Sequence, residues 1–407
     1  MSLVVQKFGG TSVADADRIR AVADHVARTR RHGSQVVVVV SAMGKETDEL
    51  LHLASQVSTT RPGREMDMLV TAGERKATAL VVMALADLGC PAASFTGSQA
   101  GFITDTTHRN AKILEVRADR LREALANGRV PVVGGAQGVS TERDVTFLGR
   151  GGSDTTAVAL AHALEADSCE LYTDVPGVFT ADPRIVPNAR RLAALSFDEM
   201  LEMSATGCPK PEMRSVEFAR THRVPLHVRS SFTWEPGTWV KEEDDTMEQA
   251  IITAVTHDTS EAKVTVNRVP DEPGIAARLF RALADRGVNV DMIVQNVSHA
   301  GTTDISFTVP KSDVDAALEV ARALTPSIGA GDVAADGDIA RVSLVGAGMR
   351  THPGVAATMF ETLAAESVNI DMISTSAIRI SCVVRGETIE RAVQVLHDAF
   401  DLGNRSS

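Results

Sequence analysis

The sequence predicts a three-layer α/β domain with a mainly parallel sheet, followed by a smaller duplicated region. In the first two thirds of the 407 residues, short β-branched runs alternate with longer amphipathic segments, the pattern of a doubly wound α/β fold. Residues 36–40 are five consecutive valines, and such an apolar run indicates a strand buried on both faces of a parallel sheet. In the last third, the segment 273–293 recurs at 353–373.

Composition excludes several classes of protein. The apolar fraction of 44% is ordinary for a globular chain, and the formal net charge of −12 leaves no basic stripe for nucleic acid. The four cysteines form no CxxC pair, which favours free thiols over a disulfide framework or a zinc site. The apolar runs are strand-sized, and no charged segment followed by an apolar one opens the chain. We therefore expect a cytoplasmic protein with no membrane or nucleic-acid partner.

The first expected strand, residues 3–5, leads directly into the sequence KFGGTS at 7–12. A cation, two glycines and two hydroxyls at a strand end are typical of a phosphate site, because glycine lets backbone N–H groups approach an anion. Thr11 and Ser12 are placed to cap a helix over residues 14–22. The spacing matches neither the P-loop nor the dinucleotide fingerprint, and an ordinary tight turn would have the same glycines.

The same alternation continues along the first domain. A helix should follow the valine strand at 46–55, and residues 71–74 should open another helix that carries the carboxylate of Glu74. Four further strands are expected, at 92–94, 130–134, 169–172 and 225–228.

The stretch LGRGGSDTT at 148–156 is the strongest candidate for chemistry. Arg150 offers a bidentate fork for a carboxylate, and the adjacent glycines let the backbone close on a small ligand. Ser153 and Asp154 begin a helix over 157–164, although an Asp in that position also serves as a simple cap. Residues 173–184 are too polar and rich in turns for core, and an ordinary surface loop would have the same composition.

The repeat in the last third indicates a duplicated module. The two copies share 12 of 21 residues, and each reads strand, Pro-Gly turn, helix, Asn-containing turn, strand. Two copies argue against a solenoid, which needs three or more. A purely structural duplication is the alternative to a ligand-binding pair. With a turn at 234–237 and a polar run at 241–246, the expected division is a domain over 1–240, a linker over 241–260, and modules over 261–337 and 338–407.

Three motifs together resemble one known family. KFGGTSV at the start, LGRGGSDTTA in the middle and YTDVPGVFTADPRIVP after it are similar to the amino acid kinase family, and specifically to the aspartokinases. The repeat resembles a pair of ACT domains, which bind small-molecule effectors. The resemblance implies a three-layer αβα amino acid kinase fold followed by two βαββαβ-type ACT domains.

The resemblance also implies an activity. ATP with Mg²⁺ would phosphorylate the side-chain carboxylate of L-aspartate, a transfer that needs positioning and charge neutralisation more than covalent help. Lys7 and Asp154 would be catalytic, and no protein side chain is assigned to the metal. The expected substrate-binding residues are Ser41, Thr47, Glu74, Arg150, Gly151, Gly152 and Ser153. The expected ATP-binding residues are Lys7, Phe8, Gly9, Gly10, Thr173, Asp174, Phe179, Asp182, Arg184 and Lys210.

Regulation and assembly are implied in the same way. Threonine, with lysine as a second candidate, would bind between ACT domains of two chains, so we expect a homo-oligomer. Met247 could also start a separate regulatory chain. Ala377 stands where the family commonly has glutamate, which favours threonine over lysine. The expected effector-binding residues are Asn289, Val290, Asp291, Gln295, Val355, Ala356, Asn369, Ile370 and Ser376.

Several residues depart from the family pattern. The nucleotide loop reads Gly-Cys-Pro-Lys-Pro at 207–211, which shifts Lys210 by one place between two prolines. Ala136 stands where a phenylalanine normally walls the amino-acid pocket, so a larger pocket is expected, and Ala136→Phe should tighten aspartate binding. Lys45 replaces a residue that is often acidic, and Phe179 stands where a tyrosine is usual. Compensated drift and a specialised substrate, such as a modified aspartate, both fit these changes.

A non-catalytic, amino-acid-sensing regulatory subunit is the other alternative. The intact Lys7, Glu74, Arg150 and Asp154 argue against it, because an unused site would be expected to lose its charged residues.

Overall fold

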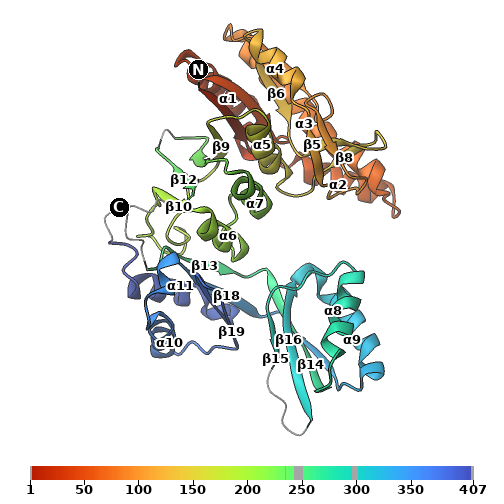
Figure 1. Cartoon of the computed structure of the whole chain (residues 1–407), viewed down its shortest axis with the longest axis vertical. Helices are drawn as coiled ribbons and strands as arrows, with labels where there is room; N and C mark the ends of the chain where they lie inside the picture. Colours follow the sequence, from red (N-terminus) through yellow and green to blue (C-terminus); the bar gives the residue numbers. More distant parts are fainter. Residues whose placement is uncertain (1, 234, 243–250, 296–300, 405–407) are drawn as a thin grey trace.

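The computed structural model describes residues 2–233, 235–242, 251–295 and 301–404. A large α/β domain comes first, and two smaller modules follow it (Figure 1). In Figure 1 the large domain lies at the top, and the module formed by the C-terminal residues lies directly below α6 (Phe197–Ala205). Within the described residues, no helix is both long and apolar enough to cross a membrane.

An eight-stranded sheet forms the centre of the large domain, in the order β10-β12-β11-β9-β1-β2-β6-β3. All neighbouring strands run parallel except β11 and β12. The strands are β1 (Leu3–Phe8), β2 (Gln35–Val40), β3 (Ala92–Phe95), β6 (Val130–Gly134), β9 (Ser168–Thr173), β10 (Ala194–Ser196), β11 (Leu226–Ser230) and β12 (Thr238–Lys241). The mainly parallel sheet and the four further strands expected from the sequence are therefore confirmed.

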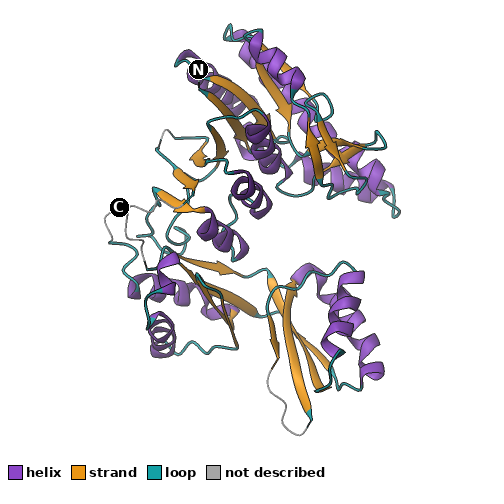
Figure 2. Ribbon diagram, viewed as in Figure 1, coloured by secondary structure: helices purple, strands orange, loops and turns teal. Residues whose placement is uncertain are grey.

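Helices cover both faces of this sheet (Figure 2). Val36, Val38 and Val40 of the valine strand join the core under α1 (Ala16–Arg31) and α3 (Gly63–Asp87), whereas Val37 and Val39 join the core on the opposite face. This division confirms the expected three layers. The opposite face is covered by α4 (Asp119–Ala126), α5 (Gly152–Ala163), α6 and α7 (Met213–His222), and α2 (Glu46–Val57) packs against α3.

A second sheet in the large domain was not predicted. Its four strands have the order β5-β4-β7-β8. They are β4 (Phe102–Thr104), β5 (Ile113–Val116), β7 (Gln137–Ser140) and β8 (Val145–Phe147). These strands are short and only half hydrophobic, so no apolar run marks them in the sequence. The sheet matters for function because the chain passes from β8 directly into the LGRGG segment.

Each repeat folds as a four-stranded antiparallel sheet with two helices. The first module has the order β15-β16-β14-β17 and the second β13-β18-β20-β19, which agrees with the expected ACT-like architecture. The first contains β14 (Glu261–Pro270), α8 (Ile275–Asp285), β15 (Ile293–Gln295), β16 (Thr302–Pro310), α9 (Val314–Ile328) and β17 (Val333–Asp336). The second contains β18 (Ile339–Val345), α10 (Val355–Ala365), β19 (Met372–Thr375), β20 (Arg379–Arg385) and α11 (Ile389–Ala399).

Strand β13 (Ala254–Asp258) comes from the interval that was expected to be a linker. It pairs antiparallel with β18 and forms one edge of the second module's sheet. The second module therefore takes one strand from the chain that precedes the first module.

Two local expectations were wrong. Residues 71–74 do not open a helix, because α3 begins at Gly63 and Glu74 lies in its middle. Thr11 and Ser12 do not cap α1, because they lie in a 3-10 turn, Gly10–Val13, and the side chain of Asp15 accepts the capping hydrogen bond from the Arg18 N–H. The start of α1 is therefore fixed by Asp15, and Ser12 is free to bond Ser231 instead.

Candidate active site

A cavity of about 540 Å³ opens at the carboxyl ends of β1, β2 and β9, beside the first turn of α5. Parallel strands bring residues that are distant in sequence to this one edge, which is the usual ligand position in open α/β sheets. Most of its walls come from five segments, the KFGGTS loop, residues 41–51, α3, residues 149–154 and residues 172–174. Arg109, Ala136, Phe147 and Lys210 complete the lining.

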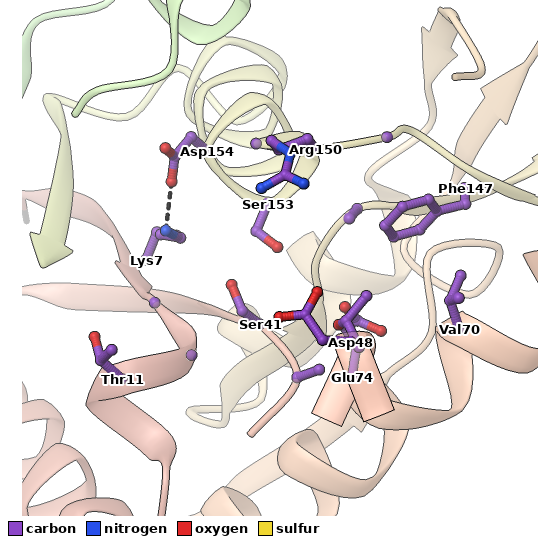
Figure 3. A pocket seen from close by; sticks show the side chains of 18 of the residues that line it. Lys7, Thr11, Ser41, Asp48, Val70, Glu74, Phe147, Arg150, Ser153 and Asp154 are labelled. Atoms are coloured by element: carbon purple, nitrogen blue, oxygen red, sulfur yellow. Dashed lines mark ion pairs between the residues drawn. The ribbon is translucent and has the colours of Figure 1, made fainter. Parts of the chain in front are cut away.

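Lys7 and Asp154 form the charged centre of the cavity. Lys7 Nζ lies 2.5 Å from Asp154 Oδ1, and both side chains are almost completely buried (Figure 3). Lys210 Nζ lies 3.9 Å from the other oxygen, Oδ2. Burial opposes the ionisation of Asp154, but the charges of Lys7 and Lys210 outweigh it and hold the pKa of this carboxyl below its usual range. Two cations thus share one carboxylate, an arrangement suited to phosphate oxygens.

The two glycines after Lys7 lie against neighbouring backbone. The N–H of Gly9 donates to the carbonyl oxygen of Tyr172 at 3.3 Å. A Cβ on Gly10 would lie 2.9 Å from the carbonyl oxygen of Ala42, so a larger residue would push this loop out of place. The loop therefore needs glycine where it passes β2.

Glu74 is the second notable group. Its carboxylate is 3% exposed, and its Oε2 accepts no hydrogen bond from the described residues. Burial raises the pKa of Glu74 to about 7, although backbone N–H groups at Glu74 and Ala42 lower it in part. A buried carboxylate without a cation is costly, and its position in a cavity indicates that the cation arrives with the ligand.

Arg150 and two hydroxyls lie between these groups. In Figure 3 the Arg150 guanidinium and the side chains of Ser41 and Ser153 face the space between the Lys7–Asp154 pair and Glu74. The position of Arg150 depends on the backbone turn at the next residue, Gly151, which is the N-cap of α5 and has a φ of 70°. A Cβ there would lie 2.2 Å from Glu212 Cγ, so this turn requires glycine.

Comparisons with known proteins agree with this geometry. The model of the amino acid kinase family matches residues 2–230, and the ACT domain model matches twice, at 264–323 and 342–400. The chain is 58% identical to the aspartokinase of Mycolicibacterium smegmatis over 408 residues, covering 99% of this chain and 97% of that protein. It is 55% identical to the aspartokinase of Corynebacterium glutamicum, with the same coverage. The chain belongs to the aspartokinase family.

Solved aspartokinases have the same fold. The crystal structure of Escherichia coli aspartokinase III in complex with aspartate and ADP, described as the R-state, superposes with a TM-score of 0.84 at 26% identity, covering 98% of this chain and 99% of that one. The same protein in complex with lysine and aspartate, described as the T-state, gives 0.77 with the same coverage. The expected family is confirmed, and the chain is a nucleotide-dependent phosphotransferase of the aspartokinase type.

Most residues expected at the aspartokinase site line this one cavity. The lining includes Lys7, Gly9, Gly10, Ser41, Thr47, Glu74, Arg150, Gly151, Gly152, Ser153, Asp154, Thr173, Asp174 and Lys210. Four expected ATP residues lie outside it. Phe8 is buried and stacks on Tyr172, and Phe179 is half-buried on a bridge to Arg191. Asp182 and Arg184 pair with each other at 2.6 Å. Their assignment to ATP stays a prediction.

Other lining residues were missed, among them Asp48, Met66, Val70, Phe147 and Tyr172. Met66 and Val70 lie on α3, which the sequence placed too late in the chain. Phe147 directly precedes the LGRGG motif, so its proximity to that motif was the available signal. Lys45, which was expected to bring a cation near the substrate, is exposed at the start of α2 and does not line the cavity.

Two of the expected effector-binding residues, Asp291 and Ser376, are linked by their contacts to the catalytic domain. Asp291 pairs with Arg341, whose side chain is 2% exposed and whose guanidinium also donates to the carbonyl oxygen of Ala205 at 2.9 Å. Ser376 donates to Glu202 at 2.9 Å. Ala205 and Glu202 belong to α6, so these contacts link both residues to the catalytic domain.

The other expected effector residues differ in exposure. Asn289, Gln295 and Asn369 are exposed, Val290, Ala356 and Ile370 are half-buried, and Val355 is buried. Met247 lies outside the described residues.

Proposed function

We propose that the cavity holds ATP phosphates at its Lys7 end and L-aspartate at its Glu74 end, and transfers the γ-phosphoryl group to the aspartate side-chain carboxylate. The observation that carries this assignment is the separation of charge, with Lys7 and Lys210 at one end and the unpaired Glu74 carboxylate at the other. Aspartokinases phosphorylate aspartate, and the structure of the E. coli relative was solved in complex with aspartate and ADP.

Each group of the amino acid has a partner of opposite charge. Glu74 would bind the α-ammonium and Arg150 the α-carboxylate, with Ser41, Thr47 and Ser153 completing the pocket. This leaves the side-chain carboxylate directed toward Lys7. No general base is required, because a carboxylate is already ionised and nucleophilic at neutral pH. Lys7 would stabilise the moving phosphoryl group, and Asp154 would keep that lysine charged and in place.

We infer that Mg²⁺ enters together with ATP. The described residues contain no group of three or more acidic, His or Cys side chains that could hold a metal by themselves. Asp174 and Asp154, which both line the cavity, fit the one or two carboxylates with which Mg²⁺–nucleotide sites are usually built. Bound there, the ion would neutralise phosphate charge.

Trapping the acyl phosphate with hydroxylamine tests the proposal. With ATP and a panel of amino acids, L-aspartate should give a hydroxamate and ADP, whereas L-glutamate and L-asparagine should give little. Hydroxamate from another amino acid and none from aspartate would refute the assignment.

Regulation and assembly are proposed on the family pattern. We infer that threonine, and lysine more weakly, bind between ACT modules of two chains, so that the protein is a homo-oligomer. The E. coli relative was solved with lysine, which supports an amino-acid effector. Light scattering should give at least a dimer, and a monomer mass at all concentrations, with and without threonine, would contradict it.

A further inference from the structure

An aromatic side chain that the family pattern does not account for lies beside Ala136. Phe147, the last residue of β8, pairs with Gln137 of β7, and the following N–H, of Leu148, donates to the carbonyl oxygen of Ala136 at 2.8 Å. Phe147 and Ala136 are therefore neighbours across two strands, and both line the cavity. Ala136 is 3% exposed. A Cβ added at Gly152 would lie 2.9 Å from the Cβ atoms of both Ala136 and Leu148, so the Ala136 methyl group faces the start of α5.

Together with α3, Phe147 forms one apolar wall of an otherwise polar cavity. Val70 is 3% exposed and Met66 is 7% exposed, so neither offers much surface. Phe147 is only half-buried, and its ring faces the cavity (Figure 3). None of these side chains is charged or donates a hydrogen bond. We therefore expect the wall to act chiefly by limiting the volume available to a ligand.

The wall lies at the amino-acid end. In Figure 3 Phe147 and Val70 are on the far side of Arg150 and Glu74 from the Lys7–Asp154 pair. Only two residues separate Phe147 from Arg150 in the sequence. The aromatic ring and Arg150, the expected partner of the substrate's α-carboxylate, therefore belong to one segment. An amino acid held by Glu74 and Arg150 would have this ring next to its carbon atoms.

We propose that Phe147 supplies, from β8, an aromatic wall at the amino-acid end of the cavity, and so restricts the pocket to aspartate without additional methyl groups. This inference rests on the proposed function. It replaces the expectation of a larger pocket, because the ring of Phe147 bounds the amino-acid end although residue 136 is small. It also reverses the expected effect of Ala136→Phe, because Ala136 has a φ of 56° and its Cβ faces Gly152 and Leu148, so a bulky side chain there would be strained.

Three variants test the wall. Phe147→Ala should lower kcat/KM for L-aspartate about tenfold and raise the ratio of kcat/KM for 3-methylaspartate or 2-methylaspartate over aspartate by about tenfold or more, which is the range for one methyl-sized gap in a pocket. Phe147→Leu, which keeps most of the side-chain volume, should retain most of the aspartate activity and selectivity. Ala136→Phe should lose aspartate activity, because it strains the turn at Ala136.

Controls separate a pocket effect from a folding effect. Phe218→Ala removes a half-buried aromatic ring of α7 that does not line the cavity, and it should leave the selectivity ratio unchanged. The KM for ATP should change less than twofold in every folded variant. If Phe147→Ala leaves the selectivity ratio unchanged, or if Phe147→Leu loses selectivity as fully as Phe147→Ala does, the proposal is wrong. Failure of the wild-type protein to phosphorylate aspartate would instead refute the proposed function.

Discussion

At the scale of single residues, the site depends on four ionisable groups, two of which are carboxylates in different environments. Asp154 is buried yet kept ionised by Lys7 and Lys210, whereas Glu74 is similarly buried and its Oε2 has no hydrogen-bond partner among the residues that the structure describes. The sequence motifs identified all four of these residues. They could not show the contrast between the two carboxylates, because it depends on which neighbours the fold brings within a few ångströms.

Lys210 should act on ATP despite its displaced position in the nucleotide loop. Its ammonium is within 3.9 Å of Asp154, near the expected phosphate groups. Lys210→Ala should raise the KM for ATP and lower kcat, by about tenfold in kcat/KM, because one charge contact to phosphate is worth about 1.4 kcal/mol or more. Steady-state kinetics measures both constants. Unchanged constants for ATP would show that the loop is only structural.

Glu74→Gln should stabilise the free protein while it abolishes aspartate binding. The pKa of Glu74 is raised from 4.5 to about 7, so its ionisation costs the folded state about 3 kcal/mol, and this cost is present above pH 7 and disappears below pH 4.5. The variant should therefore melt at a higher temperature than wild type at pH 8, and the difference should shrink toward pH 5. Thermal melting against pH measures it, and a constant difference would contradict the account.

The wild-type enzyme should also bind aspartate more weakly in acid. Below about pH 7 the free Glu74 carboxyl becomes protonated and loses its attraction for the α-ammonium group. The KM for aspartate should rise as pH falls from 8 to 6, whereas the KM for ATP should not follow the same profile. A flat profile for aspartate would argue that another group holds the ammonium.

At the scale of elements, strongly periodic segments were predictable and helix boundaries were not. The valine strand and the duplicated module could be predicted, because apolar runs and internal repeats are properties of the sequence itself. The start of α3 at Gly63 and the placement of β13 in the second module could not, since tertiary contacts determine both. The aromatic wall was missed for the same reason, because β7 and β8 are too short to show a period.

Helix α6 lies between residues expected to bind the effector and the loop that carries Lys210. Glu202 accepts a hydrogen bond from Ser376 at 2.9 Å and pairs with Arg379 at 3.0 Å, and the chain after α6 leads to Lys210. Glu202→Gln should weaken feedback inhibition, raising the half-inhibitory effector concentration about 2- to 30-fold through loss of a coupling contact. Asp198→Asn is the matched control, because Asp198 lies on the same helix and pairs at 3.0 Å with Arg220 of the catalytic domain. Equal effects of the two variants would refute a specific role for Glu202.

At the scale of the whole molecule, one catalytic domain is linked to two modules whose strands are interleaved. Because β13 precedes the first module but pairs within the second, the chain that leaves the catalytic domain is held in the second module's sheet. This arrangement can shift an equilibrium between two packings when an effector binds.

The most direct test of the account is the identity of the product made from ATP and aspartate. If Glu74 and Arg150 hold the α-ammonium and α-carboxylate, only the side-chain carboxylate faces Lys7 and the γ-phosphoryl group. Trapping with hydroxylamine, followed by NMR of the product, should give the β-hydroxamate of aspartate together with ADP, and Lys7→Ala and Asp154→Asn should each reduce it by a hundredfold or more, the scale of an electrostatic contact to the transition state. The α-hydroxamate, or AMP in place of ADP, would contradict the account.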